Sequence, residues 1–310
     1  MTLQQLQYVL ALDIHRHFVK AAESCHVAQP TLTLQVKKLE EEINMVIFDR
    51  TITPLEPTPA GINFVLKARE ILREVAELKA MVSDEKESVE GTYTIGIIPT
   101  LSPYLLPLFI NDFVVNNPNV FLNIKEIQTE SIIKGLYDNL IDIGILATPI
   151  EESGLRTINL FYEPFLIFAN EDSKLSKKEL ITSDDVTNEG LWILNDGHCF
   201  RNQVLNICGK DNLSNKFRGF TFESGTIETL KNMVRNKMGY TLIPELSVNS
   251  KIDKPYIRNF AEPKPVREIS IVVRKSFTKE KLITILRKEI INIVPEHFKK
   301  NERFFTVKWR

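Results

Sequence analysis

The pattern of apolar positions divides the chain into a helical first part and an alternating second part. Up to about residue 58, apolar residues recur at helical spacing in three short stretches, at 3–12, 18–24 and 30–39. Pro30 suits the first position of the third helix, where a backbone donor is not needed. Segments 46–50 and 55–57 then flank a proline-containing turn. This order predicts three helices and a two-stranded wing over residues 1–58, a winged helix-turn-helix.

A single long helical pattern follows. Thr58 is a suitable N-cap and Pro59 a suitable first residue, and apolar residues continue at helical intervals to about residue 86. The pattern predicts a linker helix within residues 59–88, of roughly 28 residues or ~40 Å. A helix of this length between domains normally buries its apolar stripe against a partner, so we expect it to dimerise. The alternative is that it lies on its own domain.

From residue 93 onward, apolar strand patterns alternate with helical ones. Strands are predicted at 94–99, 120–127, 142–147, 164–169, 191–194, 220–223, 240–244 and 268–274, with helices at 103–116 and 130–139. This alternation predicts an α/β fold with a mostly parallel sheet wrapped by helices. Residues 89–310 exceed what one small sheet needs, so we expect two lobes, lobe I at about 92–162 and 267–310 and lobe II at about 163–266. The chain would cross between them near Tyr162 and return near Pro265.

Composition limits the function classes. The 310 residues are 43% hydrophobic and 25% charged, which is ordinary for a globular protein, and nothing indicates a signal peptide or membrane span. Three cysteines argue against a disulfide scaffold, so we expect a reducing cytoplasm. The net charge is −1, and residues 1–58 carry five basic against seven acidic residues. Charge alone therefore argues against DNA binding, whereas the helix-turn-helix pattern favours it.

Two cysteines flank a short predicted helix. The apolar run 191–194 predicts a strand, residues 195–197 a turn, and residues 201–208 a helix that Gly209 ends. Cys199 then lies in the first helical turn, next to His198 and close to Arg201. A cationic histidine, an arginine and a helix N-terminus each lower the pKa of a thiol, so we expect a reactive thiolate.

The spacing of the two cysteines limits how they react. If the segment is one helix, Cys199 and Cys208 lie roughly 13 Å apart along its axis, and a disulfide tolerates only about 7 Å between Cα atoms. They bond only if the helix unwinds, which is the form of a redox switch with a resolving thiol. The alternative is two buried apolar cysteines. A metal site with His198 would lack a fourth ligand at a recognisable spacing, and we expect no metal and no cofactor.

Ligands of open α/β sheets bind at the carboxyl ends of the strands. Thr100 and Thr129 follow two predicted strands of the first lobe, and the segments 198–199 and 225–226 follow strands of the second. Together they predict an interlobe cleft lined by hydroxyls and a thiol. The alternative for the hydroxyls is plain helix capping. Arg267, at the start of the returning strand, suits a hinge charge as well as a site residue.

The N-terminal run 17–32, with 38–40 and 48–51, resembles the winged helix-turn-helix of LysR-type transcription regulators. Segments 98–100, 103–107, 128–129, 196–201 and 228–234, together with Cys208, resemble the peroxide-sensing members of that family. The resemblance covers nearly the whole chain and thins after about Lys275. It implies a winged helix-turn-helix, a dimerisation helix and a two-lobed redox-sensing domain like that of periplasmic binding proteins.

The resemblance also implies roles for individual residues. Cys199 would be the thiolate that attacks peroxide and Cys208 its resolving partner. Thr100, Thr129 and His198 would shape the peroxide pocket, and Arg201 and Arg267 would support it. The resemblance further implies a homodimer that assembles to a homotetramer on promoter DNA, activates antioxidant genes when oxidised and works with RNA polymerase, and so associates with the nucleoid.

The predicted recognition helix supplies the DNA contacts. The residues on or just before it, with the wing arginine, are Gln29, Pro30, Thr31, Thr33, Gln35, Lys37, Lys38 and Arg50. Two features depart from the family pattern: Thr33-Leu34 stands where Ser-Gly is usual, and the wing at 51–55 lacks basic residues. Fewer phosphate contacts imply weaker non-specific binding.

Three functions fit these patterns. The first is a peroxide-responsive transcription regulator. The second is a LysR-type regulator that responds to a small metabolite in the interlobe cleft, with incidental cysteines. The third is a thiol peroxidase, but a catalyst needs neither a DNA-reading domain nor a long dimerisation helix, so we expect no enzyme.

Overall fold

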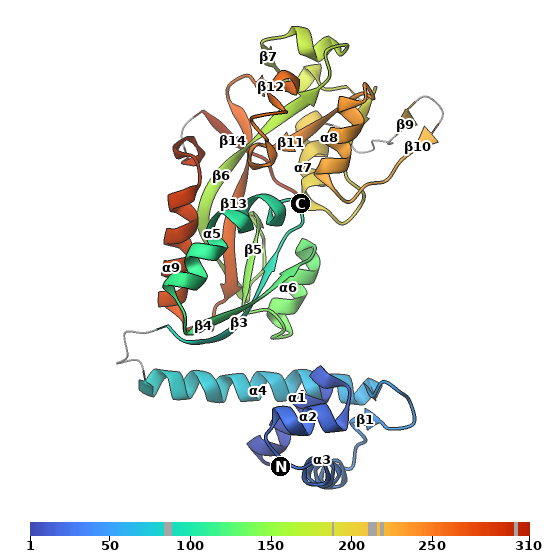
Figure 1. The fold of residues 1–310 in the computed structure, drawn as a ribbon, viewed down its shortest axis with the longest axis vertical. Coiled ribbons are helices and arrows are strands. Elements are labelled where there is room, and N and C mark those ends of the chain that lie inside the picture. The colour runs from blue at the N-terminus through green and yellow to red at the C-terminus, as the bar shows by residue number, and fades with distance from the viewer. Residues whose placement is uncertain (84–88, 188, 210–215, 218–219, 301–302) are drawn as a thin grey trace. The chain divides into compact units, whose positions relative to one another are not determined.

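The computed structural model describes the chain except for residues 84–88, 188, 210–215, 218–219 and 301–302 (Figure 1). The contacts within it divide the chain into two compact units, Met1–Ser88 and Val89–Arg310. In the part described, no helix is both long and apolar enough to span a membrane.

The first unit is a winged helix-turn-helix, as predicted. Its elements are α1 (Leu3–His15), α2 (Phe18–Ser24), α3 (Gln29–Glu42), β1 (Phe48–Asp49), β2 (Glu56–Pro57) and α4 (Pro59–Ser83). Helix α1 begins with a capping box between Thr2 and Gln5. The buried faces of α1 and α3 meet in one apolar cluster that also includes Ile47 and the wing residue Phe48. Strands β1 and β2 pair antiparallel.

Helix α4 begins where the sequence predicts. The Thr58 hydroxyl accepts a hydrogen bond from the Gly61 N–H at 2.9 Å, so Thr58 is the N-cap. Gly61 lies so close to the chain before the wing that a Cβ atom would be 1.9 Å from the Ile47 carbonyl oxygen. Val65 and Ala68 are buried, whereas Ile62 and Leu78 are exposed. The predicted end of the linker, residues 84–88, lies outside the described residues.

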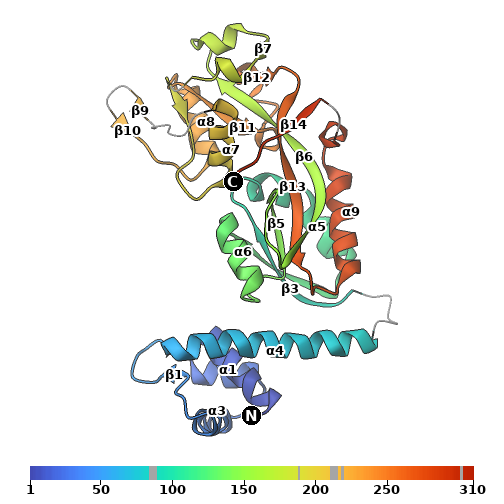
Figure 2. The same ribbon diagram turned by 180° about the vertical axis from the view of Figure 1, so that it is seen from behind.

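The second unit is built on one large sheet covered by helices (Figures 1 and 2). Its strands are β3 (Gly91–Ile97), β4 (Val120–Glu126), β5 (Ile143–Thr148), β6 (Leu155–Ala169), β7 (Leu180–Ile181), β8 (Leu191–Trp192), β11 (Tyr240–Pro244), β12 (Ile257–Phe260), β13 (Lys264–Arg274) and β14 (Phe304–Thr306). Its helices are α5 (Ser102–Asn116), α6 (Thr129–Tyr137), α7 (Cys199–Cys208), α8 (Ile227–Arg235) and α9 (Glu280–Ile293).

The expectation of a mostly parallel sheet is wrong. The main order is β4-β3-β5-β13-β6-β11-β8, and β13 and β6 run antiparallel to each other and to their neighbours β5 and β11. The cause is the length of β6, which the sequence predicted only from residue 164. Its first half interleaves polar residues such as Arg156 and Asn159 among apolar ones, and β13 pairs with it from Leu155 to Pro164. The predicted strand at 220–223 is β10 (Phe220–Thr221), which pairs only with β9 (Lys216–Phe217) among the described strands.

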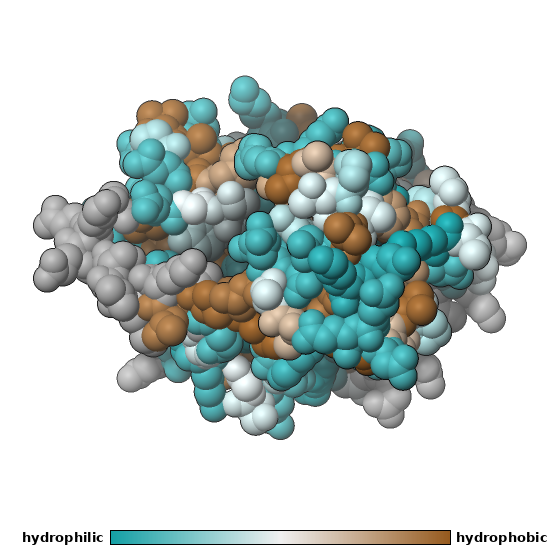
Figure 3. Space-filling view, turned by 90° about the horizontal axis from the view of Figure 1, so that it is seen from below, coloured by the Kyte–Doolittle hydropathy of each residue, from teal (hydrophilic) through white to brown (hydrophobic). Residues whose placement is uncertain are grey.

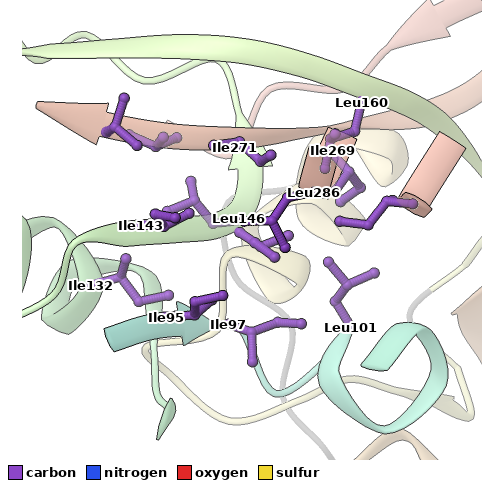
Figure 4. Packing of buried hydrophobic residues seen from close by; sticks show 14 of the residues in the cluster. Ile95, Ile97, Leu101, Ile132, Ile143, Leu146, Leu160, Ile269, Ile271 and Leu286 are labelled. Carbon is purple, nitrogen blue, oxygen red and sulfur yellow. The ribbon is translucent and has the colours of Figure 1, made fainter. Parts of the chain in front are cut away.

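Two separate apolar cores lie along this sheet. The first core packs α5, α6 and α9 against β3, β5 and the facing parts of β6 and β13; Figure 4 shows its central isoleucines and leucines, among them Ile95, Ile143 and Ile271. The second core packs α7 and α8 against β8, β11 and the other half of β6. The two cores define two lobes, which are joined by β6 and β13. Both strands pass from one lobe to the other where Glu163 lies opposite Arg267. The surface seen in Figure 3 mixes apolar and polar patches, as is usual for proteins.

Candidate functional site

Helix α7 begins at Cys199 and ends at Cys208. Before it, Gly197 takes a left-handed φ of 90° and lies against lobe I, because a Cβ there would be 2.7 Å from Gln128 Oε1. His198 is the N-cap residue, and Gly209 ends the helix with a φ of 62°. The predicted helix and its end are confirmed. It starts two residues earlier than predicted, so that Cys199 is its first residue.

Cys199 lies at the seam between the lobes. Its side chain is 4% exposed and packs in the first core, whereas the next residue, Phe200, packs in the second core. The start of α7 therefore inserts from lobe II into lobe I. Cys208, half-buried, packs against the second core. Cys199 and Cys208 form no disulfide with each other in this structure, so the helix is in the dithiol form.

The electrostatics around Cys199 differ from the expectation. Burial raises the pKa of the Cys199 thiol, and the Thr129 hydroxyl, the Arg267 guanidinium and the backbone N–H groups at the start of α7 act in the opposite direction. Burial also lowers the pKa of His198, which favours the neutral imidazole. A cationic His198 therefore does not support the thiol.

Arg201 does not act on the thiol as expected. Its NH1 donates to the Leu194 carbonyl at 2.8 Å, and its Nε pairs with Asp196 at 2.9 Å. These contacts hold the turn before α7. Residues two positions apart on a helix point in different directions, so Arg201 does not face Cys199. The cation near Cys199 is Arg267 instead, which lies far from it in sequence.

Arg267 is fully buried and fully partnered. Its Nε donates to Glu163 Oε2 at 2.8 Å, its NH1 to Thr100 Oγ1 at 2.9 Å and its NH2 to the Thr100 carbonyl at 3.0 Å. The guanidinium also lies 5.5 Å from the ring centre of Phe200. Burial raises the pKa of Glu163, against the effect of Arg267 and of the Leu246 N–H that Glu163 accepts at 2.8 Å. This network fixes a positive charge beside the thiol.

Thr129 offers an open hydrogen-bonding group at the same place. Its side chain is 1% exposed, and its hydroxyl makes no hydrogen bond of good geometry within the described chain. The hydroxyl is near enough to Cys199 to lower the pKa of the thiol. Because this contact lacks the geometry of a good hydrogen bond, the Thr129 hydroxyl is still available to a small polar molecule. Thr100, His198 and Arg267 are buried as well.

The predicted DNA-contacting residues lie on or next to α3. Gln29, Pro30, Thr31, Lys37 and Lys38 are exposed, and Thr33 and Gln35 are half-buried. Gln29 Nε2 donates to Thr33 Oγ1 at 2.9 Å, while Gln35 accepts from Gln5 on α1 at 3.3 Å.

Arg50 on the wing is held by the protein itself. Its NH2 pairs with Glu40 at 2.7 Å, and its guanidinium lies 5.6 Å from the ring centre of Phe18. Glu40, 9% exposed, also accepts from the Ile47 and Phe48 N–H groups at 2.8 and 3.2 Å. Part of the Arg50 charge is therefore used to stabilise the wing.

Family comparisons agree with this architecture. The family model "Bacterial regulatory helix-turn-helix protein, lysR family" matches residues 3–62, and "LysR substrate binding domain" matches residues 86–290. The chain belongs to the LysR family. As a LysR regulator it binds DNA and regulates transcription, as the sequence predicted.

Individual LysR-family relatives match over most of the chain. One is the "DNA-binding transcriptional dual regulator OxyR" of Escherichia coli K12, 37% identical over 276 residues, which cover 88% of this chain and 90% of that protein. The "hydrogen peroxide-inducible genes activator" of Pectobacterium carotovorum is 36% identical over 277 residues, covering 88% and 90%. A full-length OxyR variant of Pseudomonas aeruginosa has 32% identity and a TM-score of 0.81, covering 95% of this chain and 99% of that one. The resemblance to the peroxide-sensing members of the family is thus confirmed.

Glu163 was not predicted as a site residue, and Gln128 and Tyr104 were matched to the family without a role being assigned to either. Glu163, the partner of Arg267, stands as a lone carboxylate within the apolar run 160–169, which was a usable sign of a buried ion pair. Gln128 lies against Gly197. Tyr104 on α5 donates to Glu228 on α8 at 3.1 Å and so links the lobes; burial raises the pKa of this tyrosine.

Proposed function

We propose that this LysR-family regulator responds to hydrogen peroxide through Cys199. The observation that carries the proposal is the position of Cys199: a buried thiol at the first residue of α7, beside the unpaired Thr129 hydroxyl and the Arg267 cation, with a second thiol at the other end of the same helix. The name of the Pectobacterium carotovorum relative, a hydrogen peroxide-inducible genes activator, points to the same signal.

The first chemical step oxidises Cys199. Its thiolate attacks one oxygen of hydrogen peroxide, so an S–O bond forms and the O–O bond breaks, and the departing hydroxide takes a proton and leaves as water. The sulfur loses two electrons and the peroxide gains them. Donors from Thr129 and neutral His198 stabilise the peroxide oxygens, and Thr100 orients Arg267, whose charge favours the thiolate. Arg201 supports the site indirectly, through the turn before α7.

The second step joins the two thiols. The Cys208 thiolate attacks the sulfur of the Cys199 sulfenic acid, so the S–S bond forms while the S–O bond breaks, and the departing hydroxide takes up the proton that the Cys208 thiol released and leaves as water. The ten residues of α7 place these cysteines at its two ends, roughly 13 Å apart along the axis. The disulfide limit is about 7 Å between Cα atoms, so α7 has to unwind before the bond closes.

The unwound segment alters how subunits pack. Exposed Ile62 and Leu78 on α4 support dimerisation through this helix. We propose a homodimer that assembles to a homotetramer on promoter DNA in the cytoplasm, at the nucleoid, and contacts RNA polymerase. The α3 residues would bind DNA, with Gln29, Thr31 and Thr33 at base edges and Lys37 and Lys38 at phosphates.

Mass spectrometry of the full-length protein after one equivalent of peroxide tests the chemistry. We expect a Cys199–Cys208 disulfide in the wild type and none in Cys199→Ser, with Cys25, the remaining cysteine, left as a thiol. Footprinting of the reduced, oxidised and Cys199→Ser proteins on promoter DNA tests the output. An unmodified Cys199, or three identical footprints, would favour a metabolite-responsive regulator instead.

A further inference from the structure

The C-terminal segment Arg303–Arg310 runs along the crossing of the two lobes. Strand β14 pairs parallel with the start of β13, and the Val307 N–H continues the ladder to the Val266 carbonyl at 2.9 Å. Val266 immediately precedes Arg267. The segment lies beyond residue 290, where the LysR substrate-binding match ends.

This segment holds the middle of α7. The side-chain amide of Gln203, fully buried, donates to the Val307 carbonyl at 3.0 Å, and the Asn206 amide donates to the Lys308 carbonyl at 2.8 Å. Gln203 and Asn206 both lie between the two cysteines. Any unwinding that brings Cys199 and Cys208 together therefore moves both donors.

The same segment is anchored in both lobes. Val307 packs in the second core, and Trp309, 5% exposed, packs in the first core, which also contains Cys199. Arg310 lies 4.6 Å from the ring centre of Trp309 and forms ion pairs with Glu130 on α6 and with Glu152. Glu130 directly follows Thr129 of the thiol site.

We propose that residues 303–310 form a strap that positions α7 in its reduced, helical form and sets the thiol–disulfide equilibrium. The inference rests on the proposed disulfide between Cys199 and Cys208. Because the strap contacts α7 only while the helix is intact, its contacts favour the dithiol form, and losing them shifts the equilibrium toward the disulfide by the same factor.

The strap interface includes two polar atoms without a partner in the described chain. Gln203 Oε1 and Trp309 Nε1 are both buried and form no hydrogen bond there. A buried polar group without a partner costs free energy, so the interface holds α7 less tightly than its apolar area alone would. This suits a contact that opens at each oxidation.

The test compares the redox potential of the full-length protein and its strap variants, measured in dithiothreitol redox buffers with the disulfide fraction read by mass spectrometry. Trp309→Ala removes the anchor in lobe I, and we expect a shift of about tenfold toward the disulfide, which is about 30 mV for a two-electron couple. Arg310→Ala, a milder change that keeps the core intact, should shift it about threefold. Lys308→Ala is the matched control, because its side chain is exposed and its carbonyl remains.

The outcomes separate the strap from the redox switch itself. A strap with a merely structural role would lower the stability of both redox forms and leave the potential unchanged. Potentials of Trp309→Ala and Arg310→Ala equal to the control would overturn the strap while leaving the switch intact. If Trp309→Ala does not fold, Arg310→Ala alone decides. A wild type that forms no disulfide at all contradicts the proposed function, and the strap with it.

Discussion

Removal of Arg267 should cost more stability than removal of the whole Glu163–Arg267 pair. Both side chains are 0% exposed, and Arg267→Met leaves Glu163 as a buried carboxylate without its cation. Breaking a buried ion pair from one side costs about 3–5 kcal/mol, a large part of a typical stability of about 5–15 kcal/mol. In the double variant Glu163→Gln/Arg267→Met both charges are gone, and the side-chain carbonyl of the introduced amide still accepts from the Leu246 N–H. The expected cost then falls to about 1–3 kcal/mol, mainly for the lost donors to Thr100.

Urea unfolding followed by tryptophan fluorescence measures this directly, because the two tryptophans, Trp192 and Trp309, both lie in the unit Val89–Arg310. The pH dependence gives a second check. Burial raises the pKa of Glu163 above its ordinary 4.5, and more so without Arg267. A raised pKa gives stability that is present below the unfolded pKa and is lost as pH rises through the folded one, so the deficit of Arg267→Met should grow from pH 4 to pH 8. A double variant as unstable as the sum of the single variants would refute the argument.

Three further predictions concern the thiol, the DNA-binding helix and the turn before α7. Since burial raises the Cys199 pKa, the rate of its reaction with peroxide, measured by stopped flow, should rise about tenfold per pH unit below that pKa. Thr129→Val should move this pH profile to higher pH, because the Thr129 hydroxyl lowers the thiol pKa. A rate independent of pH from 6 to 9 contradicts this. Lys37→Ala and Lys38→Ala should each reduce the salt slope of DNA affinity by roughly 0.9, measured by fluorescence anisotropy. Arg50→Ala, which removes the partner of Glu40, should instead mainly destabilise the unit Met1–Ser88. Equal salt slopes in all three variants would contradict this difference. Gly197→Ala should cost about 1–3 kcal/mol in urea unfolding because of its positive φ and the Gln128 side chain, while Gly225→Ala, whose Cβ would find only an ordinary contact at 3.6 Å, should cost much less.

Local signals in the sequence predicted much of this fold. The N-cap at Thr58, the glycine that ends α7 and the apolar periodicity of α1 and α3 all act over a few residues, and each is confirmed. Thr129 is predicted in the interlobe cleft because it follows a predicted strand, whereas the role of Arg267 beside the thiol comes from the resemblance to the LysR family. Their roles toward peroxide stay a prediction.

What the sequence could not predict depends on contacts between distant residues. Glu163 and Arg267 meet only because β6 and β13 cross, and the polar first half of β6 hid that strand from its apolar pattern. Arg201 is close to Cys199 in sequence but points to Asp196, and burial lowers the pKa of His198, which favours its neutral form. Proximity in sequence thus overstated the effect of both Arg201 and His198 on the Cys199 thiol, because side-chain direction and burial decide the electrostatics.

The pairing of β6 with β13 has a mechanical consequence. The two strands are bonded from Val266 opposite Pro164 to Arg274 opposite Leu155, and β6 continues unbroken into lobe II to pair with β11 and β12. Moving the two lobes apart would break main-chain hydrogen bonds between β6 and β13, each worth about 0.5–1.5 kcal/mol. Opening the lobes is therefore costly, and a solute as large as an amino acid would reach the buried Cys199 thiol only at the expense of this ladder.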